Sequence, residues 1–454
     1  MMDSVFDAFV KKSPITVMAR GMMERVLNPE QLNAWFDNTA EVQYTRQLLF
    51  SSVFDIMSQV VCGHHPSIHG AFQASKEDIS VSITSLYNKL NGIEARTSAE
   101  LVRYAAGQMQ PIIEQLGGGQ KPLIPGFRVK LLDGNCIAAT EHRLKELRCT
   151  AAGALPGKTL VVYDPSLRIP IDVFPCEDGH AQERSLLQEV LPSVEKGDLW
   201  IADRNFCVRS FLFEIDAKEA YFIIRQHANL PYTPIGNEKA TGSIDGVAVF
   251  EQHIVVRDES GKECKFRRIR ILLKKATRDG DKEIFLITNV SRRRVHAKQV
   301  AVLYRKRWKI ETAFQELTEH LNCEIKTLGY PPAALFAFCI ALVSYMILAI
   351  MKAALSSVYG AERIDKEVSG YYIADELSAI YPGMMIAVSD DKWHVFRQYS
   401  QAELVEFLKQ LAKNVKLSRF KKHPRGPKKP TAKPKSDPKH PHVSTARLLA
   451  GRKK

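Results

Sequence analysis

Two aspartates occupy positions where a sheet can carry chemistry. Asp133 ends the run FRVKLLD (127–133), and Asp203 ends the run LWIAD (199–203). Desolvating an ionised carboxylate at the end of a buried strand costs on the order of several kcal/mol, which a bound cation would offset. The carboxyl ends of strands are also the edge of an α/β sheet where sites form. Each aspartate has a structural alternative, as a turn residue or a helix N-cap, and both alternatives stay open.

A third carboxylate, Glu311, lies in a segment with helical periodicity, residues 295–321, which we predict to be one long helix. Offsets of three, four and seven residues return to the same face, so Tyr304, Arg307, Glu311 and Thr318 form one stripe. A carboxylate suits a hard divalent metal, and a guanidinium and a phenol nearby suit a phosphate. The alternative for Glu311 is an exposed ion pair with Arg307.

The elements that must position these carboxylates alternate between strand and helix. The predicted order is strand 127–133, strand 158–164, strand 169–174, helix 181–194, strand 199–203, helix 206–217 and strand 221–226. This is a mixed α/β order with parallel elements, and it makes residues 126–227 the first part of a core. Short β-prone runs with turn signals predict an all-β insertion over 228–281. The run EIFLITNV then returns to the main sheet in the second part of the core, 282–358.

Helices flank this core on both sides. Apolar residues at three- and four-residue spacing predict a helical N-terminal domain over 1–120, ended by a linker at Gly117–Gly119. A short helix between Ser82 and Gly92 is either a DNA recognition helix or a plain member of a bundle. Its polar side carries Thr84, Ser85, Tyr87, Asn88 and Lys89. Residues 359–415 are predicted to be a C-terminal helical region, a candidate for dimerisation.

The positive charge gathers at the C-terminus. Residues 416–454 contain fourteen Lys or Arg and one acid, so the rest of the chain is close to neutral against a total net charge of +14. Six prolines between Pro424 and Pro441 predict a tail that is extended and disordered when free. Such a tail indicates a polyanionic partner, either nucleic acid or an anionic membrane surface. The proline spacing leaves no amphipathic face for a membrane, which favours nucleic acid.

One stretch, residues 333–355, is long and apolar enough to cross a membrane. We interpret it as a buried helix of a large core, because Lys352 interrupts it and the chain has no second such run. We therefore expect no membrane partner.

Eight scattered cysteines without a CxxC pair indicate reduced thiols in a cytosol. The first twelve residues lack a basic region followed by an apolar run, so we expect no signal peptide. The string Cys62-x-His64-His65-x3-His69 has half the spacing of a zinc site, but no second pair of ligands follows. We interpret these histidines as incidental.

Three separated blocks resemble a known family. The string Tyr304-x2-Arg307-x3-Glu311 resembles the signature of the insertion-sequence DDE transposases of family four. DGN at 133–135 and ADRNF at 202–206 are similar to the first and second aspartate blocks of that family. The resemblance spans about 125 to 330, in matching order, with helical flanks and a basic tail.

The resemblance implies an RNase H-like core with the all-β insertion placed before the catalytic Glu. It implies that Asp133, Asp203 and Glu311 are the catalytic residues and the ligands of two Mg²⁺ ions, with Mn²⁺ as a substitute. It implies DNA contacts by Tyr304 and Arg307 near the end of the element. One departure concerns the phosphate clamp, because the family has a Lys seven residues after the Glu, where this chain has Thr318.

Further DNA contacts are expected around the site and in the tail. Lys326 or Lys309 is a candidate for the charge missing at position 318, although neither starts from the same place. Trp308 either stacks on a displaced base or packs in the core. In the tail, DNA binding by counterion release points to Lys421, Lys422 and Arg425.

These expectations describe a cytoplasmic, nucleoid-associated bacterial transposase that cleaves and rejoins DNA. Its partners would be double-stranded DNA, as transposon ends and as target, and a second copy of the chain in a synaptic complex. The two metal ions would activate a water or a 3′-hydroxyl and stabilise the leaving oxygen of an in-line phosphodiester displacement. The alternative is a transposase-derived DNA-binding protein that does not cleave.

Overall fold

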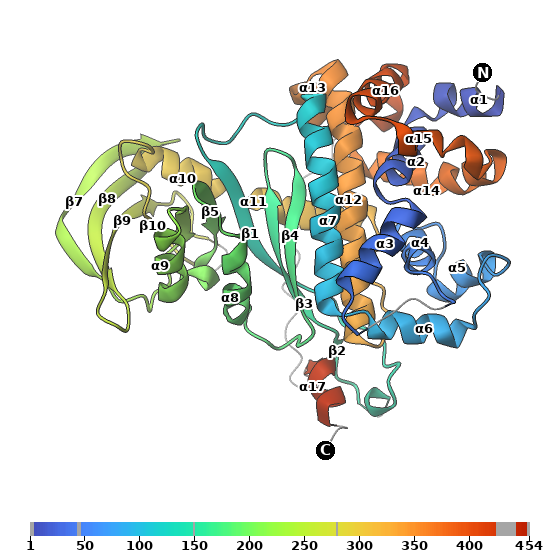
Figure 1. The fold of residues 1–454 in the computed structure, drawn as a ribbon. Helices are drawn as coiled ribbons and strands as arrows, with labels where there is room; N and C mark the ends of the chain where they lie inside the picture. The colour runs from blue at the N-terminus through green and yellow to red at the C-terminus, as the bar shows by residue number, and fades with distance from the viewer. Residues whose placement is uncertain (1–3, 43–46, 149, 278–279, 424–441, 452–454) are drawn as a thin grey trace.

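The computed structural model describes residues 4–42, 47–148, 150–277, 280–423 and 442–451. A large sheet forms one side of the molecule and a body of helices forms the other (Figure 1). Two long helices, α7 (Ala95–Leu116) and α12 (Pro331–Tyr359), lie side by side between them, and α7 packs on β4 (Ile169–Cys176). The sheet therefore rests on a helical layer built from both ends of the chain.

The N-terminal third is helical, as its periodicity predicts. Before α7 come α1 (Ser4–Lys12), α2 (Pro14–Val26), α3 (Pro29–Thr39), α4 (Phe50–Val61), α5 (Ile68–Ala74) and α6 (Ile83–Gly92). Ser82 caps α6, because its side chain accepts a hydrogen bond from the backbone N–H of Ser85. Gly117 ends α7 in the left-handed region at φ 67°. Both predicted helix boundaries are confirmed.

The main sheet has the strand order and directions of an RNase H-like core. Its first five strands are β1 (Arg128–Cys136), β3 (Lys158–Asp164), β4, β5 (Asp198–Ala202) and β6 (Tyr221–Arg225). They are arranged β4-β3-β1-β5-β6, with β1, β5 and β6 parallel and with β3 antiparallel to both of its neighbours. The mixed α/β class and the predicted order of strands are confirmed.

Side chains of β1 alternate between two apolar clusters, one on each face of the sheet. Val129 and Leu131 belong to the cluster shared with the helical body. Leu132 belongs to the cluster on the other face, under α8 (Leu187–Val190) and α9 (Arg209–Ala217). Both faces of the strand that carries Asp133 are thus held by packing.

The insertion is all-β but does not form a sheet of its own. It consists of β7 (Thr233–Ile244), β8 (Val247–Arg257) and β9 (Glu263–Leu272). The returning strand β10 (Glu283–Thr288) pairs antiparallel with β6 on one side and with β9 on the other. The insertion therefore extends the core sheet to nine strands and leaves β7 at its edge.

The predicted single helix over 295–321 is wrong in one respect, because the structure divides it into α10 (Ala297–Arg305) and α11 (Trp308–His320). At the division the hydrogen bonds shorten to i→i+3, from the N–H of Arg307 to the carbonyl of Tyr304 and from that of Ile310 to Arg307. These i→i+3 bonds interrupt the α-helical hydrogen-bond pattern between α10 and α11.

The long apolar helix α12 lies in the middle of the helical body. It is long and apolar enough to span a membrane, but 94% of its most apolar window is buried inside the protein. It packs on α7, on α4 and on the later helix α16 (Gln401–Asn414). Lys352 on this helix pairs with Glu316 at 3.3 Å. These contacts identify α12 as a core helix.

The helices after α12 share a core with the N-terminal helices. They are α13 (Ala361–Glu367), α14 (Gly370–Ala387), α15 (Val395–Gln398) and α16 (Gln401–Asn414). Phe36 and Leu101 from the first part and Phe396 and Leu408 from the second belong to one continuous apolar cluster. From the sequence, 1–120 and 359–415 are predicted as two separate regions, whereas the structure packs them into one layer.

Part of the predicted disordered tail is ordered in the structure. Val443–Ser444 forms β11, which pairs with β2 (Ala154–Leu155), and Thr445–Ala450 forms α17. Val443 and Leu449 pack against a small cluster that includes Leu147. This apolar contact explains why residues 442–451 are ordered. The proline and lysine content, on which the prediction rested, gives no information about such a contact. Arg425 lies outside the described residues.

Candidate active site

The two aspartates lie at the same level on neighbouring parallel strands. Leu132 of β1 is opposite Ala202 of β5, so the next residue of each strand is Asp133 or Asp203. Neighbouring strands are about 4.8 Å apart, which brings the two carboxylates together at the carboxyl edge of the sheet. The parallel pairing of β1 with β5 therefore creates the pair.

Arg307 connects Asp133 to Glu311. Its guanidinium donates one hydrogen bond to Oδ2 of Asp133 at 2.7 Å and another to Oε1 of Glu311 at 2.6 Å. The Arg307 side chain is 11% exposed and that of Asp133 is 16% exposed, whereas half of the Glu311 side chain is open to solvent. The ion pair considered as the alternative for Glu311 is present, and it extends to the first aspartate.

Each aspartate also accepts a local backbone hydrogen bond, but only Asp203 takes up its structural alternative, because Asp133 lies within β1. Oδ1 of Asp203 accepts from the backbone N–H of Asn205 at 2.7 Å, which makes Asp203 the N-cap of a short 3-10 helix, Arg204–Phe206. Oδ1 of Asp133 accepts from the N–H of Gly134 at 3.0 Å. Each of these bonds uses one oxygen of its carboxylate, so it orients the group and leaves the second oxygen for another partner.

The pKa of Asp133 shows that the three carboxylates have too little positive charge around them. Burial is the largest cause of a rise in the pKa of Asp133, Arg307 opposes it, and the charges of Asp203 and Glu311 add to it, so that the pKa is about 7. A carboxylate in such surroundings is stabilised by a cation. Arg307 is the cation that stands between Asp133 and Glu311 in this structure.

The donor set fits a hard divalent metal in type but is not arranged as a closed ligand cage. Within the described ranges, no three His, Cys, Asp or Glu side chains are close enough together to hold an ion as they stand. The guanidinium of Arg307 lies between Asp133 and Glu311, and carboxylate oxygens are the ligands that Mg²⁺ accepts. Metal binding therefore requires Arg307 to leave at least one of them.

Glu183, which the sequence did not single out, ties the two aspartate segments together. It begins the 3-10 turn Glu183–Leu186 that follows β4, and its Oε2 accepts from the side-chain amide of Asn205 at 3.0 Å. The same carboxylate lies against Gly134, where a Cβ would collide with it. Gly134 and Asn205, the residues that accompany the aspartates in both sequence blocks, thus have packing roles.

A basic side chain from β6 completes this edge of the sheet. Arg225 is the last residue of β6 and pairs with Asp281 at 2.5 Å, and Arg204 lies 3.9 Å from the same carboxylate. The charge of Arg225 also affects the pKa of Tyr304, which burial raises. The run YFIIR ends on this arginine, but one residue without a pattern carried no functional signal.

Tyr304 and Trp308 lie in opposite surroundings. Tyr304 is 8% exposed and belongs to the core cluster, so it reaches no DNA as placed, in contrast to the predicted contact. It stands behind Arg307 and close to the charge of Asp203. Trp308 is 65% exposed, so the core alternative for this residue is wrong.

The remaining predicted DNA contacts vary in accessibility. Lys326 is exposed, and its backbone carbonyl accepts from Glu141 at 2.7 Å. Lys421 forms a β-bridge with Val368, and the amine of Lys422 donates to the carbonyl of Asp365 at 2.6 Å. Thr318 is exposed, and its hydroxyl donates to the carbonyl of Phe314.

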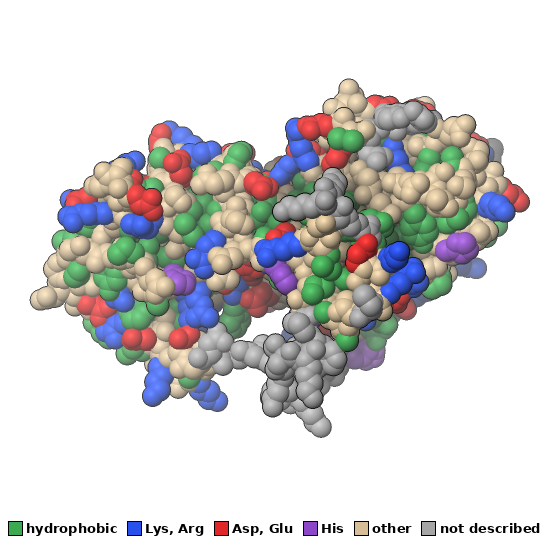
Figure 2. Space-filling model, turned by 90° about the horizontal axis from the view of Figure 1, so that it is seen from below, with side chains coloured by type: hydrophobic (Ala, Val, Ile, Leu, Met, Phe, Trp, Pro, Cys, Tyr) green, Lys and Arg blue, Asp and Glu red, His purple; other side chains and the backbone are tan. Residues whose placement is uncertain are grey.

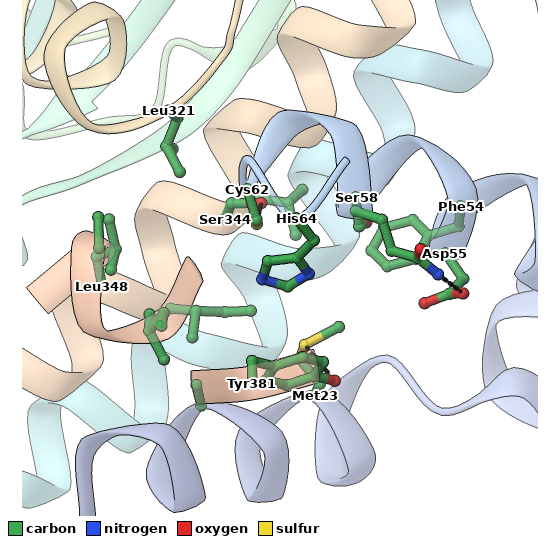
Figure 3. A pocket seen from close by; sticks show the side chains of 16 residues that line it. Met23, Phe54, Asp55, Ser58, Cys62, His64, Leu321, Ser344, Leu348 and Tyr381 are labelled. Atoms are coloured by element: carbon green, nitrogen blue, oxygen red, sulfur yellow. Dashed lines mark hydrogen bonds between the residues drawn. The ribbon is translucent and has the colours of Figure 1, made fainter. Parts of the chain in front are cut away.

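A small cavity of about 60 Å³ in the helical body includes two residues of the zinc-like string (Figure 3). The ring of His64 stacks on that of Tyr381, with ring centroids 5.1 Å apart. The thiol of Cys62 donates to the hydroxyl of Ser344 at 3.7 Å. The interpretation of the whole string as incidental stays a prediction.

Comparison with known proteins agrees with this geometry. Residues 125–347, a range that includes all three carboxylates, match the family model described as "Transposase DDE domain". Over 195 residues the chain is 25% identical to "Putative transposase y4zB" of Sinorhizobium fredii (strain NBRC 101917 / NGR234). That match covers 42% of this chain and 52% of the relative, so it spans about half of the relative's length.

Among solved structures, the chain matches the cryo-EM structure of the piggyBac transposase synaptic complex with hairpin DNA. The match has 12% identity and a TM-score of 0.31, and it covers 84% of this chain and 88% of that chain. So low a TM-score supports no argument about fold or function. The family model and the order of the three carboxylate blocks agree: residues 125–347 are a transposase DDE domain.

Proposed function

We propose that this chain is a transposase of the insertion-sequence family four, which binds the ends of a mobile element and performs metal-dependent DNA cleavage and strand transfer. One observation carries the proposal. Asp133 and Asp203 follow the same rung of two parallel strands, and Arg307 links Asp133 to Glu311 on α11. Three carboxylates from three elements thus converge beside a guanidinium.

Asp133, Asp203 and Glu311 would hold two Mg²⁺ ions, which supply the activation of a water or 3′-hydroxyl and the stabilisation of the leaving oxygen. The residues of the chain orient these ligands. The Asn205 N–H fixes Asp203, and the Gly134 N–H fixes Asp133. Arg307, once it leaves the carboxylates, is placed to bind a phosphate oxygen of the DNA.

The structural support for DNA as the partner comes from clefts on the surface rather than from one basic patch. Seen from below, Lys and Arg side chains are spread over both halves of the molecule among acidic ones (Figure 2). A cleft of about 620 Å³ lies between α6 and the segment after β1, and its lining includes Tyr87, Asn91, Arg143 and Lys145. This placement favours α6 as a recognition helix for the duplex end of the element.

Two other predicted contacts are accessible to DNA. Thr327, next to the exposed Lys326, lines the α6 cleft, and Trp308 offers an open aromatic face beside Arg307. A homodimer on two element ends is part of the proposal, because strand transfer joins two ends to one target.

The experiment that tests this proposal measures cleavage and binding separately. We expect Asp133→Asn, Asp203→Asn and Glu311→Gln each to lower Mg²⁺-dependent cleavage of an element-end duplex by at least about 10³-fold, a loss of about 4 kcal/mol in barrier stabilisation. Duplex binding should persist, because each change removes negative charge. Glu259→Gln, at an exposed turn far along the insertion, is the matched control. Normal cleavage by any one of the three would contradict the assignment.

One observation favours a second candidate, a transposase-derived DNA-binding protein that does not cleave. Thr318 occupies the place of the family's lysine, and its hydroxyl is used within its own helix. The same assay separates the two candidates, since this alternative predicts duplex binding by the unmodified chain without Mg²⁺-dependent cleavage.

A further inference from the structure

A second polar cleft lies on the side of α11 that faces away from Glu311. Its volume is about 400 Å³, and it is bounded by α11, α12, α13 and the turn between β3 and β4. Its charged lining comprises Arg168, Lys306, Lys309, Lys352, Glu316 and Asp365. Lys309 and Glu316 are two turns apart on α11, and both lie on roughly the opposite face of this helix from Glu311. The cleft is therefore behind α11 as seen from Glu311.

Both acids of this cleft are already paired. The Asp365 carboxylate accepts from the Arg168 guanidinium and, at 3.3 Å, from the side-chain amide of Gln120. The Glu316 carboxylate accepts from the hydroxyl of Tyr345 at 3.1 Å and from the amine of Lys352 at 3.3 Å. Each acid therefore has its own cation, Arg168 or Lys352.

Two lysines of the cleft have no acidic partner of their own. Among the described residues, neither Lys306 nor Lys309 has an acidic partner within 4.0 Å. Lys309 is half-buried, so its charge lies partly inside the cleft. The cleft thus holds more positive charge than its own acids neutralise, and an anion would relieve the repulsion.

We propose that this cleft binds a phosphate of a DNA backbone, in a segment distinct from the strand at the carboxylates. Lysines act as point charges toward phosphate, and the amines of Lys306 and Lys309 in this lining are donors of the kind that backbone contacts use. With side chains a helix is about 10 Å across, so α11 would lie between two DNA contacts. The proposal rests on the proposed function, because it needs a DNA-bound chain.

The test uses the full chain and fluorescence anisotropy with a labelled duplex that contains the element end and its flanking DNA. The test variant is Lys306→Gln with Lys309→Gln. The control is Lys76→Gln with Lys413→Gln, which removes the same charge from exposed lysines outside the cleft. We expect the test variant to bind about tenfold more weakly than the control variant and its salt dependence to flatten by about 1 to 2 log units per log unit of salt.

Three outcomes decide the proposal. Equal affinity and salt slope in the test and control variants would overturn it while leaving the proposed function intact. Loss of inorganic phosphate binding by calorimetry, with duplex binding unchanged, would also overturn it and assign the cleft to a free anion. Absence of duplex binding by the unmodified chain would overturn the proposed function and this inference together. Equal midpoints of urea unfolding in both variants exclude a folding defect as the cause.

Discussion

At the scale of single residues, the site also depends on side chains that the pattern of acidic residues in the sequence does not reveal. Asp133, Asp203 and Glu311 stand out because each follows an apolar run or shares a helix face with Arg307. Glu183 and Arg225 do not stand out, because each is one charged residue at the end of an ordinary element. Their roles depend on β1, β5 and β6 being neighbours, which no local spacing records.

Gly134 provides a residue-scale prediction. A Cβ at this position would collide with the Glu183 carboxylate and displace it from Asn205, so Gly134→Ala should destabilise the fold by about 0.5–1.5 kcal/mol, the usual net contribution of one hydrogen bond. Glu183→Ala removes the obstacle, and the double variant should be more stable than the sum of the two single changes predicts. Urea unfolding of the four proteins measures the coupling. Strictly additive free energies would show that Gly134 and Glu183 do not pack as described.

At the scale of elements, apolar periodicity predicted most strands and helices, because each buries a continuous face. The division of the helix at 306–307 escaped prediction, since neither Lys306 nor Arg307 breaks a helix by type. There the tertiary contacts of Arg307 with Asp133 and Glu311 accompany the tighter turn. The ordered end of the tail also escaped prediction, because Val443 and Leu449 find apolar partners only in the fold.

The cavity beside α4 gives an element-scale prediction about pH. Burial, followed by the charge of His65, lowers the pKa of His64 from its usual value of 6.5 to about 4. Between these values the unfolded chain binds a proton that the folded chain does not, so stability falls as the pH drops from 6.5 to 4. The effect is at most about 3 kcal/mol and is absent above pH 6.5.

The variant His64→Phe keeps a ring against Tyr381 and cannot titrate. Its free energy of unfolding should decrease less between pH 7 and pH 4.5 than that of the unmodified chain. His180→Gln, at an exposed position, is the control. An identical pH dependence in His64→Phe and the unmodified chain would show that His64 titrates freely.

At the scale of the whole molecule, one helical layer supports a nine-stranded sheet, and the site lies where the sheet's parallel edge meets α11. The sequence indicated the sheet and the basic tail. It did not indicate that the first and last helices share one core around α12, because contacts across several hundred residues leave no local pattern. The clefts beside α6 and behind α11 are products of that assembly.

The central claim is that carboxylates from β1, β5 and α11 form one metal site, and Mn²⁺ binding tests it without relying on cleavage. The complex of the full chain with an element-end duplex is titrated with Mn²⁺, and the free ion is followed by electron paramagnetic resonance. We predict up to two bound ions per chain. We also predict at least about a tenfold loss of affinity in Asp133→Asn, Asp203→Asn and Glu311→Gln, but not in Glu259→Gln. Equal Mn²⁺ binding by the unmodified chain and these three variants would contradict the claim.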